Sequence, residues 1–139
     1  MSTLQVVFER PPMFAEIAAA FPVADNGVIF AWGDRIYNPS RIEITPALMA
    51  HEEVHGRRQM AMGEIERWWW QYITNPGFRL HEELPAHAAE LSVMQRDAVN
   101  RHQRRSAVKI VAKKLAAPLY GGLVSPGTAQ SMLLAVPHA

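Results

Sequence analysis

Hydrophobic and polar positions change character about a third of the way along this chain. Runs rich in β-branched and aromatic residues occupy positions 4–8 and 28–37, and Gly33-Asp34 divides the second run. Such runs favour strands, and a Gly-Asp pair between them favours a hairpin turn. The Ala-rich residues 13–21 lie between the two runs and are typical of a short helix. The N-terminal third is therefore predicted to form a small sheet with one helix inserted.

From Thr45 onward the pattern is helical. Thr45 is a good N-cap, Pro46 is favoured at the first helical position and Gly63 is a favoured stop, which predicts a helix over 46–62. Apolar spacing and turn residues predict further helices over 64–73, 78–99, 106–117 and from 126 to just before Pro137. Pro85 is tolerated within the long helix only as a kink or in a first turn. We therefore expect an α+β fold, with a small N-terminal sheet packed on the 46–62 helix and a mostly helical C-terminal half.

The composition is that of one globular domain covering residues 1–139. Hydrophobic residues make up 49% and charged residues 19% of the chain, which excludes a disordered protein. No apolar run is long enough to span a bilayer, and the N-terminus has neither the basic opening nor the continuous apolar stretch of a signal peptide. The chain has no Cys, which excludes thiolate catalysis and sulfur ligands for a metal. Any metal must therefore bind to nitrogen and oxygen atoms.

Charge is divided unevenly along the chain. Residues 1–95 carry 7 Lys and Arg against 12 Asp and Glu, whereas residues 96–139 carry 7 against 1. The helical segment from about residue 100 is therefore basic, which permits contact with nucleic acid, an anionic surface or an acidic partner. No interleaved aromatic residues accompany this charge, and this argues against nucleic acid. The simplest interpretation is the solvated side of an amphipathic helix.

The predicted 46–62 helix contains the sequence His51-Glu52-Glu53-Val54-His55, which matches the H-E-x-x-H pattern. Two His residues four positions apart project from the same helix face and can bind one ion. Glu52 lies beside them, where it can take a proton from a water molecule bound to that ion. The side predicted to be buried is a different one, which carries Ala47, Ala50, Val54 and Ala61.

A catalytic zinc ion usually has a third protein ligand. The segment His81-Glu82-Glu83-Leu84-Pro85-Ala86-His87, followed by Glu90, supplies carboxylates on a later helix that can fold back across the first. Glu82, Glu83 and Glu90 are alternatives, because a kink at Pro85 would change which carboxylate faces inward.

The pair of motifs His51-Glu52-x-x-His55 and Glu83-x-x-Ala86 resembles the gluzincin group of zinc metallopeptidases. Residues 41–90 are similar to small metallopeptidases encoded by tailed bacteriophages and prophages. The resemblance implies a minimal zincin-like fold and one Zn²⁺ ion held by His51, His55 and Glu83, with Glu52 as the general base. It also implies that the strand near residues 36–37 is the sheet edge on which a peptide substrate lies.

His87 departs from the family pattern, which often has Asp at this place. It lies four residues after Glu83 and on the same helix face, so we expect it either to assist catalysis, by hydrogen bonding to a ligand or by stabilising the oxyanion, or to be a surface His without a part in the reaction. Tyr72, Tyr120 and Arg79 are alternative oxyanion donors.

The expected activity is that of a zinc-dependent metallopeptidase, which hydrolyses a peptide or amide bond. A peptide or a peptidoglycan-derived peptide is the expected substrate, in the cytoplasm or in a virion. The alternative is a non-enzymatic phage virion or assembly protein, which retains a zinc-binding zincin fold and contacts phage structural proteins through its basic C-terminal surface.

Overall fold

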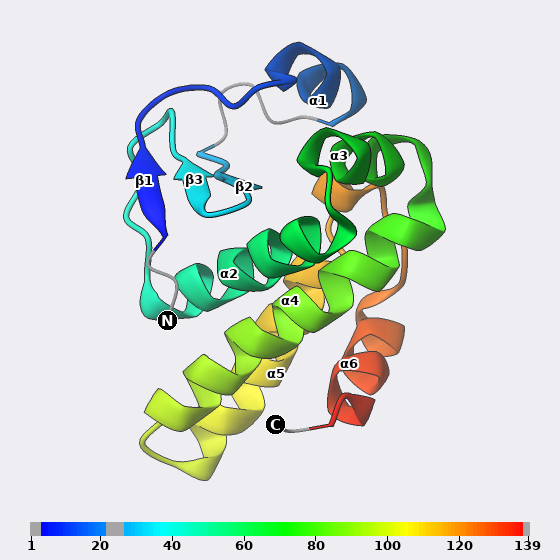
Figure 1. Ribbon diagram of the computed structural model, residues 1–139. Helices are drawn as coiled ribbons and strands as arrows, with labels where there is room; N and C mark the ends of the chain where they lie inside the picture. The colour runs from blue at the N-terminus through cyan, green and yellow to red at the C-terminus, as the bar shows by residue number, and fades with distance from the viewer. Residues whose placement is uncertain (1–3, 22–26, 138–139) are drawn as a thin grey trace.

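The structure is a computed structural model that describes residues 4–21 and 27–137 (Figure 1). Its elements are β1 (Gln5–Val7), α1 (Phe14–Ala20), β2 (Phe30–Trp32), β3 (Arg35–Tyr37), α2 (Pro46–Met62), α3 (Ile65–Thr74), α4 (Pro76–Asp97), α5 (Arg101–Leu115), the 3-10 helix η1 (Pro118–Tyr120) and α6 (Pro126–Ala135). The described residues thus form six α-helices and a three-stranded sheet. The predicted α+β class, with a small N-terminal sheet and a mostly helical C-terminal half, is confirmed.

The sheet has the strand order β1-β3-β2, in which β1 is parallel and β2 antiparallel to β3. The β2–β3 hairpin turns at Gly33, whose φ of 63° suits a glycine, as the sequence predicts. The expectation that residues 36–37 form a sheet edge is wrong, because β3 is the central strand. Strand β2, the other strand of the hairpin, pairs with one side of β3, and β1 pairs with the other side. The edge strand that packs against α2 is β2.

Helix α2 lies between the sheet and α4 (Figure 1). It begins and ends as predicted, with the Thr45 side chain accepting a hydrogen bond from the amide of Leu48 and Gly63 in the left-handed region. The hairpin turn rests directly on this helix at Gly56. A Cβ atom at Gly56 would lie only 2.2 Å from the carbonyl oxygen of Gly33. The missing side chain therefore lets the sheet approach the helix one residue after His55.

Gln59 fastens the sheet to α2. Its side chain is fully buried, accepts a hydrogen bond from the amide of Gly33 at 2.7 Å and donates one to the carbonyl oxygen of Ala31 at 3.0 Å. Nε1 of Trp69 donates to the same Ala31 oxygen at 3.2 Å. Two helices therefore hold β2 through side chains, and this fixes the sheet above the H-E-x-x-H segment.

Helix α3 packs mainly through aromatic rings. Trp68 and Trp69 are buried while Trp70 is 48% exposed, as expected for consecutive positions on a helix.

Helix α4 begins at Pro76, two residues before the predicted start, because the Asn75 side chain accepts a hydrogen bond from the amide of Phe78 and so caps the first turn. The helix continues through Pro85 to Asp97.

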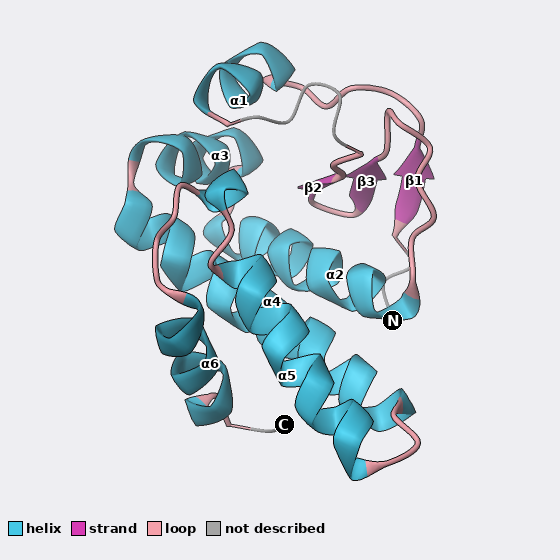
Figure 2. Ribbon diagram, turned by 180° about the vertical axis from the view of Figure 1, so that it is seen from behind, coloured by secondary structure: helices cyan, strands magenta, loops and turns pink. Residues whose placement is uncertain are grey.

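The C-terminal helices form a second apolar cluster. Helix α5 begins five residues before the predicted position 106, because Asn100 acts as its N-cap. Figure 2 shows α5 along α4, with α6 beside them. Ala129 and Leu133 of α6 are buried in this cluster, so the last helix docks on the core as expected. No helix in residues 4–21 or 27–137 has the length and apolar character needed to cross a membrane.

Candidate metal centre

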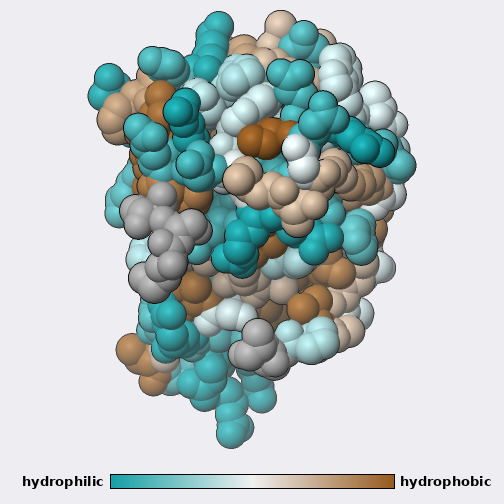
Figure 3. All heavy atoms as spheres, in the orientation of Figure 1, coloured by the Kyte–Doolittle hydropathy of each residue, from teal (hydrophilic) through white to brown (hydrophobic). Residues whose placement is uncertain are grey.

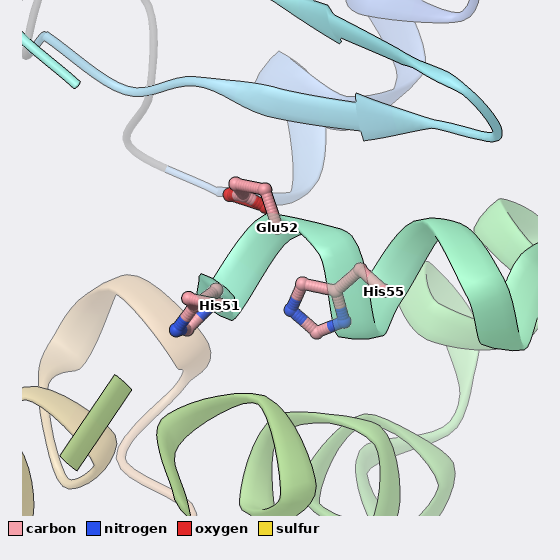
Figure 4. Close-up of side chains that lie close together, drawn as sticks. All are labelled: His51, Glu52 and His55. Atoms are coloured by element: carbon pink, nitrogen blue, oxygen red, sulfur yellow. The ribbon is translucent and has the colours of Figure 1, made fainter. Parts of the chain in front are cut away.

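Helix α2 presents His51, Glu52 and His55 inside the protein. Figure 4 shows both imidazole rings on the side of α2 that faces α4, and Glu52 on the side that faces the sheet. The two ring centroids are 4.9 Å apart, and all three side chains are buried. The prediction of a separate buried apolar side on α2 is wrong, because Ala61 is exposed and the most buried positions include these polar residues. The helix buries them because the sheet covers it on one side and α4 on the other.

Glu83 of α4 is the carboxylate that faces both histidines. Its Oε1 lies 3.4 Å from Nε2 of His51, and its Oε2 lies 3.1 Å from Nε2 of His55. Two ligand atoms bound to one tetrahedral zinc ion at the usual 2.0–2.2 Å are separated by about 3.3 Å. The two separations between Glu83 and the histidines, each made by a different oxygen of Glu83, are therefore close to the separation of ligand atoms in a tetrahedral zinc site.

The other two carboxylates named as alternatives have different partners. Glu82 accepts hydrogen bonds from the guanidinium of Arg58 at 2.8 and 2.9 Å and from Nε1 of Trp68 at 2.8 Å. Glu90 lies 2.9 Å from Nδ1 of His51 and forms an ion pair with Lys114 of α5. Of the three carboxylates, Glu83 is the one placed against Nε2 of both histidines.

Glu90 instead orients His51. A carboxylate on Nδ1 of an imidazole fixes the ring so that Nε2 points elsewhere, which is a common support for a metal ligand. Here Nε2 of His51 points toward Glu83. Lys114 adds a positive charge at the outer side of Glu90. Sequence reasoning missed Lys114, since nothing in the pattern of the basic helix separates it from its solvated neighbours.

His87 lies behind Glu83 and is fully buried. Its Nδ1 donates a hydrogen bond to the backbone carbonyl of Glu83 at 2.8 Å and lies 3.3 Å from Oε1 of the same residue. Its ring centroid is 4.5 Å from that of His51. Two groups of buried side chains are therefore close enough to hold a metal ion: His51, Glu52 and His55, and also His51, His87 and Glu90.

Four side-chain atoms of this cluster are buried without a hydrogen-bond partner within the described part of the chain. They are Oε2 of Glu52, Nδ1 of His55, Oε1 of Glu83 and Nε2 of His87. Buried polar atoms are nearly always paired, so four orphaned atoms in one cluster require an explanation. A bound cation with a water molecule would satisfy the two carboxylate oxygens, whereas Nδ1 of His55 is not the ring nitrogen that faces Glu83. The residues present therefore fit a metal ion.

The charges of the cluster are strongly coupled. Burial opposes protonation of His51, but hydrogen bonds to Glu83 and Glu90 outweigh it and raise the pKa of His51 from 6.5 to about 10. Burial also opposes ionisation of Glu83, yet the charge of His55 and hydrogen bonds from the histidines hold the pKa of Glu83 well below its usual value. Burial raises the pKa of Glu52. Without a metal ion, a protonated His51 is thus the cationic partner of Glu83 and Glu90.

A cavity of about 70 Å³ adjoins the cluster. His51, Glu52, His55 and Glu83 form part of its wall, and apolar side chains from α1, β2 and η1 form much of the rest. His87 is not among the residues that line it. Glu52 therefore reaches the space in which a small molecule could meet these side chains, whereas His87 bonds to the backbone carbonyl of Glu83 and does not line that space.

The alternative oxyanion donors are placed differently from one another. The Tyr72 hydroxyl donates to Oε2 of Glu83 at 2.5 Å. Arg79 donates to the carbonyl oxygens of residues 72, 73 and 120 at 2.9 to 3.0 Å. Both side chains are therefore engaged in holding α3, α4 and η1 together. Tyr120 lines the cavity and packs its ring against His87 at a centroid distance of 5.3 Å.

No known protein family, curated protein or solved structure matches this chain. The gluzincin resemblance and the zincin-like fold stay predictions.

Proposed function

We propose that this protein is a zinc-dependent metallopeptidase with a minimal zincin-like fold, which hydrolyses a peptide or amide bond. The observation that carries the proposal is the Glu83 carboxylate, which lies 3.4 Å from Nε2 of His51 and 3.1 Å from Nε2 of His55. Glu52 accompanies these three residues, and its buried Oε2 has no partner in the described residues. This set supplies three ligands and a base beside a cavity.

His51, His55 and Glu83 would hold one Zn²⁺ ion. Zinc bound by nitrogen and oxygen ligands with one open position lowers the pKa of a bound water molecule and polarises a carbonyl group. The choice of zinc rests on the two imidazole nitrogens, because calcium and magnesium prefer oxygen ligands alone.

Glu52 would act as the general base. Its carboxylate would take a proton from the attacking water molecule and pass it to the amine that leaves. Burial raises the pKa of Glu52, which brings the side chain closer to the range in which it can both accept and return a proton near neutral pH. The Glu52 side chain lies on the side of α2 that faces the sheet (Figure 4), and one of its oxygens is still within 4.8 Å of ring nitrogens of His51 and His55.

His87, Tyr72 and Glu90 would position the ligands rather than contact the substrate. His87 and Tyr72 both bond to Glu83, and Glu90 bonds to Nδ1 of His51. Tyr120 borders the cavity and is the remaining donor for a developing oxyanion. The proposed substrate is a peptide or a peptidoglycan-derived peptide. A phage or prophage origin of the protein and its location in the cytoplasm or in a virion stay predictions.

A second candidate function rests on the basic face of α5. Residues 98–139 contain six Lys and Arg and no Asp or Glu. The exposed members of this set on the helix are Arg101, Arg104, Arg105, Lys109, Lys113 and Lys114, the last of which pairs with Glu90. Figure 3 shows hydrophilic side chains at the projecting end where α4 turns into α5. A non-enzymatic virion or assembly protein would use this face to bind an acidic partner, and its zinc ion would serve stability alone.

A change at Glu52 distinguishes the two proposed functions. In the enzyme, Glu52→Gln should keep about one zinc ion per chain and lose at least about a hundredfold in peptide turnover, because general-base catalysis contributes at least that much. Zinc content is measured by elemental analysis and turnover by a broad peptide-cleavage screen. Glu53→Gln is the matched control, since Glu53 is the next residue of α2 and its partly exposed side chain pairs only weakly with Arg57 at 3.9 Å.

Retention of turnover in Glu52→Gln would contradict the role of Glu52. A wild-type protein that binds zinc but cleaves no peptide would instead favour the structural function.

A further inference from the structure

The cavity beside the metal cluster has two unlike halves. His51, Glu52, His55 and Glu83 form the polar half. The other half is apolar, and its aliphatic and phenyl side chains are Ile17, Phe21, Val28, Ile29, Phe30 and Leu119. Metal binding and proton transfer use only the polar half. The apolar half therefore needs a separate explanation.

The apolar half has been assembled from distant parts of the chain. Ile17 and Phe21 come from α1 and its C-cap, Phe30 comes from β2, and Leu119 comes from η1, which follows α5. Ile17, Phe21 and Phe30 are themselves buried in the core. These segments leave between them a space that is partly open to solvent, which close packing of the core does not by itself require.

Three of the four Trp and Tyr residues that line the cavity turn their polar atoms to other partners, and the fourth, Tyr120, is the proposed oxyanion donor. Nε1 of Trp68 bonds to Glu82, Nε1 of Trp69 bonds to the carbonyl oxygen of Ala31, and the Tyr72 hydroxyl bonds to Glu83. A polar side chain that entered the apolar half would lose its hydration without gaining these groups as partners. The lining therefore selects an apolar group.

The volume limits the size of that group. A cavity of about 150 Å³ holds one benzene molecule, so six carbon atoms occupy about that space. The cavity here measures about 70 Å³, which is about half as much. This volume covers both halves of the cavity, so the apolar half admits at most a group of about three carbon atoms, the size of a valine side chain.

Few main-chain hydrogen bonds are open to a substrate peptide on the neighbouring strand β2. The carbonyl oxygen of Ala31 on the edge strand β2 already accepts hydrogen bonds from Gln59 and Trp69. A peptide that paired with β2 at Ala31 would have to displace them. Selectivity therefore depends more on a side chain that enters the cavity than on strand pairing at this residue.

We propose that the apolar half of this cavity is a side-chain pocket, and that it directs the hydrolase to amide bonds next to a small aliphatic residue of up to valine size. This inference rests on the proposed function, because the polar half of the same cavity supplies the metal ligands and the base. Larger aliphatic, aromatic and charged residues at that substrate position are disfavoured.

The test uses alkyl and aryl hydroxamates, whose head group chelates a zinc ion while the substituent probes the space beside it. Binding of acetohydroxamate, isobutyrohydroxamate and benzohydroxamate to the zinc-loaded protein is measured by isothermal titration calorimetry. We expect isobutyrohydroxamate to bind about fifteenfold more tightly than acetohydroxamate, because it buries two more carbon atoms. Benzohydroxamate should bind more weakly than isobutyrohydroxamate.

Two changes at Leu119 test whether the cavity causes this order. Leu119→Ala enlarges the apolar half and should raise benzohydroxamate affinity about tenfold, until it exceeds that of isobutyrohydroxamate. Leu119→Phe fills the space and should abolish the advantage of isobutyrohydroxamate over acetohydroxamate. If one variant does not fold, the other still tests the pocket. Leu134→Ala on α6 is the control, because Leu134 is 61% exposed and does not line the cavity.

Equal affinity for all three hydroxamates, or a preference for benzohydroxamate in the wild-type protein, would overturn the pocket and leave the metal site standing. A protein that takes up no zinc and binds none of the three would overturn the pocket and the proposed function together. An unchanged order of affinities in both Leu119 variants would show that another surface makes the selection.

Discussion

Nε2 of His55 lies 3.1 Å from Oε2 of Glu83, although the whole of α3 separates the two residues along the chain. The crossing of α2 and α4 produces this proximity. Ala86 is fully buried and lies three residues after Glu83, on the same side of α4, where a small side chain allows a close approach of the two helices. The ligand set is therefore a property of the helix pair and not of either motif alone.

Replacement of the carboxylates one at a time ranks their roles. Glu83→Ala should weaken zinc binding by more than about a hundredfold, because it removes a ligand. Glu90→Ala should cost about ten- to a hundredfold, as is usual when the support of a ligating histidine is lost. Glu82→Ala should leave zinc affinity nearly unchanged, since Glu82 bonds to Arg58 and Trp68 instead. Competition with a fluorescent zinc chelator measures all three, and a larger loss in Glu82→Ala than in Glu83→Ala would reject the ligand set.

The Glu82 carboxylate predicts a dependence of stability on pH. Burial opposes its ionisation, but the hydrogen bonds from Arg58 and Trp68 outweigh this and lower the pKa of Glu82 below 4.5. A carboxyl group with a lowered pKa in the folded state stabilises the fold above the unfolded pKa and loses this contribution as the pH falls. Glu82→Gln should therefore cost about 1–3 kcal/mol of unfolding free energy at pH 7.

The difference between wild type and Glu82→Gln should shrink steadily below about pH 4.5, the ordinary pKa range of this group. Urea unfolding in the presence of a zinc chelator measures it without the contribution of the metal. Glu53→Gln serves as the comparison, because its ion pair with Arg57 is long and largely exposed. A cost that stays constant down to pH 3 would contradict the ionic origin of the stabilisation.

The close approach of α2 and α4 predicts the effect of a larger residue at Ala86. Ala86→Leu inserts three carbon atoms into a fully buried contact, which should destabilise the fold by about 1–3 kcal/mol. The helices should also separate, so zinc affinity should fall even though every ligand is kept. Ala89→Leu is the control, because Ala89 lies on the same helix and is only partly buried. Equal zinc affinity in the two variants would mean that Ala86 does not set the ligand distances.

The sequence determines some of these features locally and others only through tertiary packing. The bounds of α2 follow from Thr45, Pro46 and Gly63, which are local signals, and the structure confirms them. The starts of α4 and α5 were misplaced because Asn75 and Asn100 act as N-caps before weakly patterned first turns. Strand periodicity reveals that β3 exists, but its central place depends on a long-range pairing with β1.

The residues of the candidate site also divide into those that the local sequence predicts and those that depend on tertiary packing. The i, i+4 spacing places His51 and His55 on one face of any helix, so these two positions could be predicted from the sequence. Which of Glu82, Glu83 and Glu90 faces them depends on the rotation of α4 about its axis, and the residues of α4 alone do not fix that rotation. The packing of the whole of α4 against α2, α3 and α5 fixes it, and in that rotation Glu82 meets Trp68 and Arg58 while Glu90 meets Lys114.

The last prediction concerns Gly56, where the sheet rests on α2. A Cβ atom at this position would lie 2.2 Å from the carbonyl oxygen of Gly33, a distance that backbone atoms cannot accept without moving. Gly56→Ala should therefore lift the hairpin from the helix, strain the hydrogen bonds of Gln59 to that hairpin and destabilise the fold by about 1–3 kcal/mol.

Gly127→Ala is the matched control for Gly56→Ala, because Gly127 also lies in a helix but a Cβ atom there would meet nothing within 4 Å. This change should be neutral or stabilise the protein by up to about 1 kcal/mol, since alanine loses less backbone entropy on folding. Thermal unfolding of the two variants measures the contrast. If Gly56→Ala were as stable as Gly127→Ala, the sheet would not rest on α2 at this point, and the wall of the cavity beside Glu52 would have to be formed in another way.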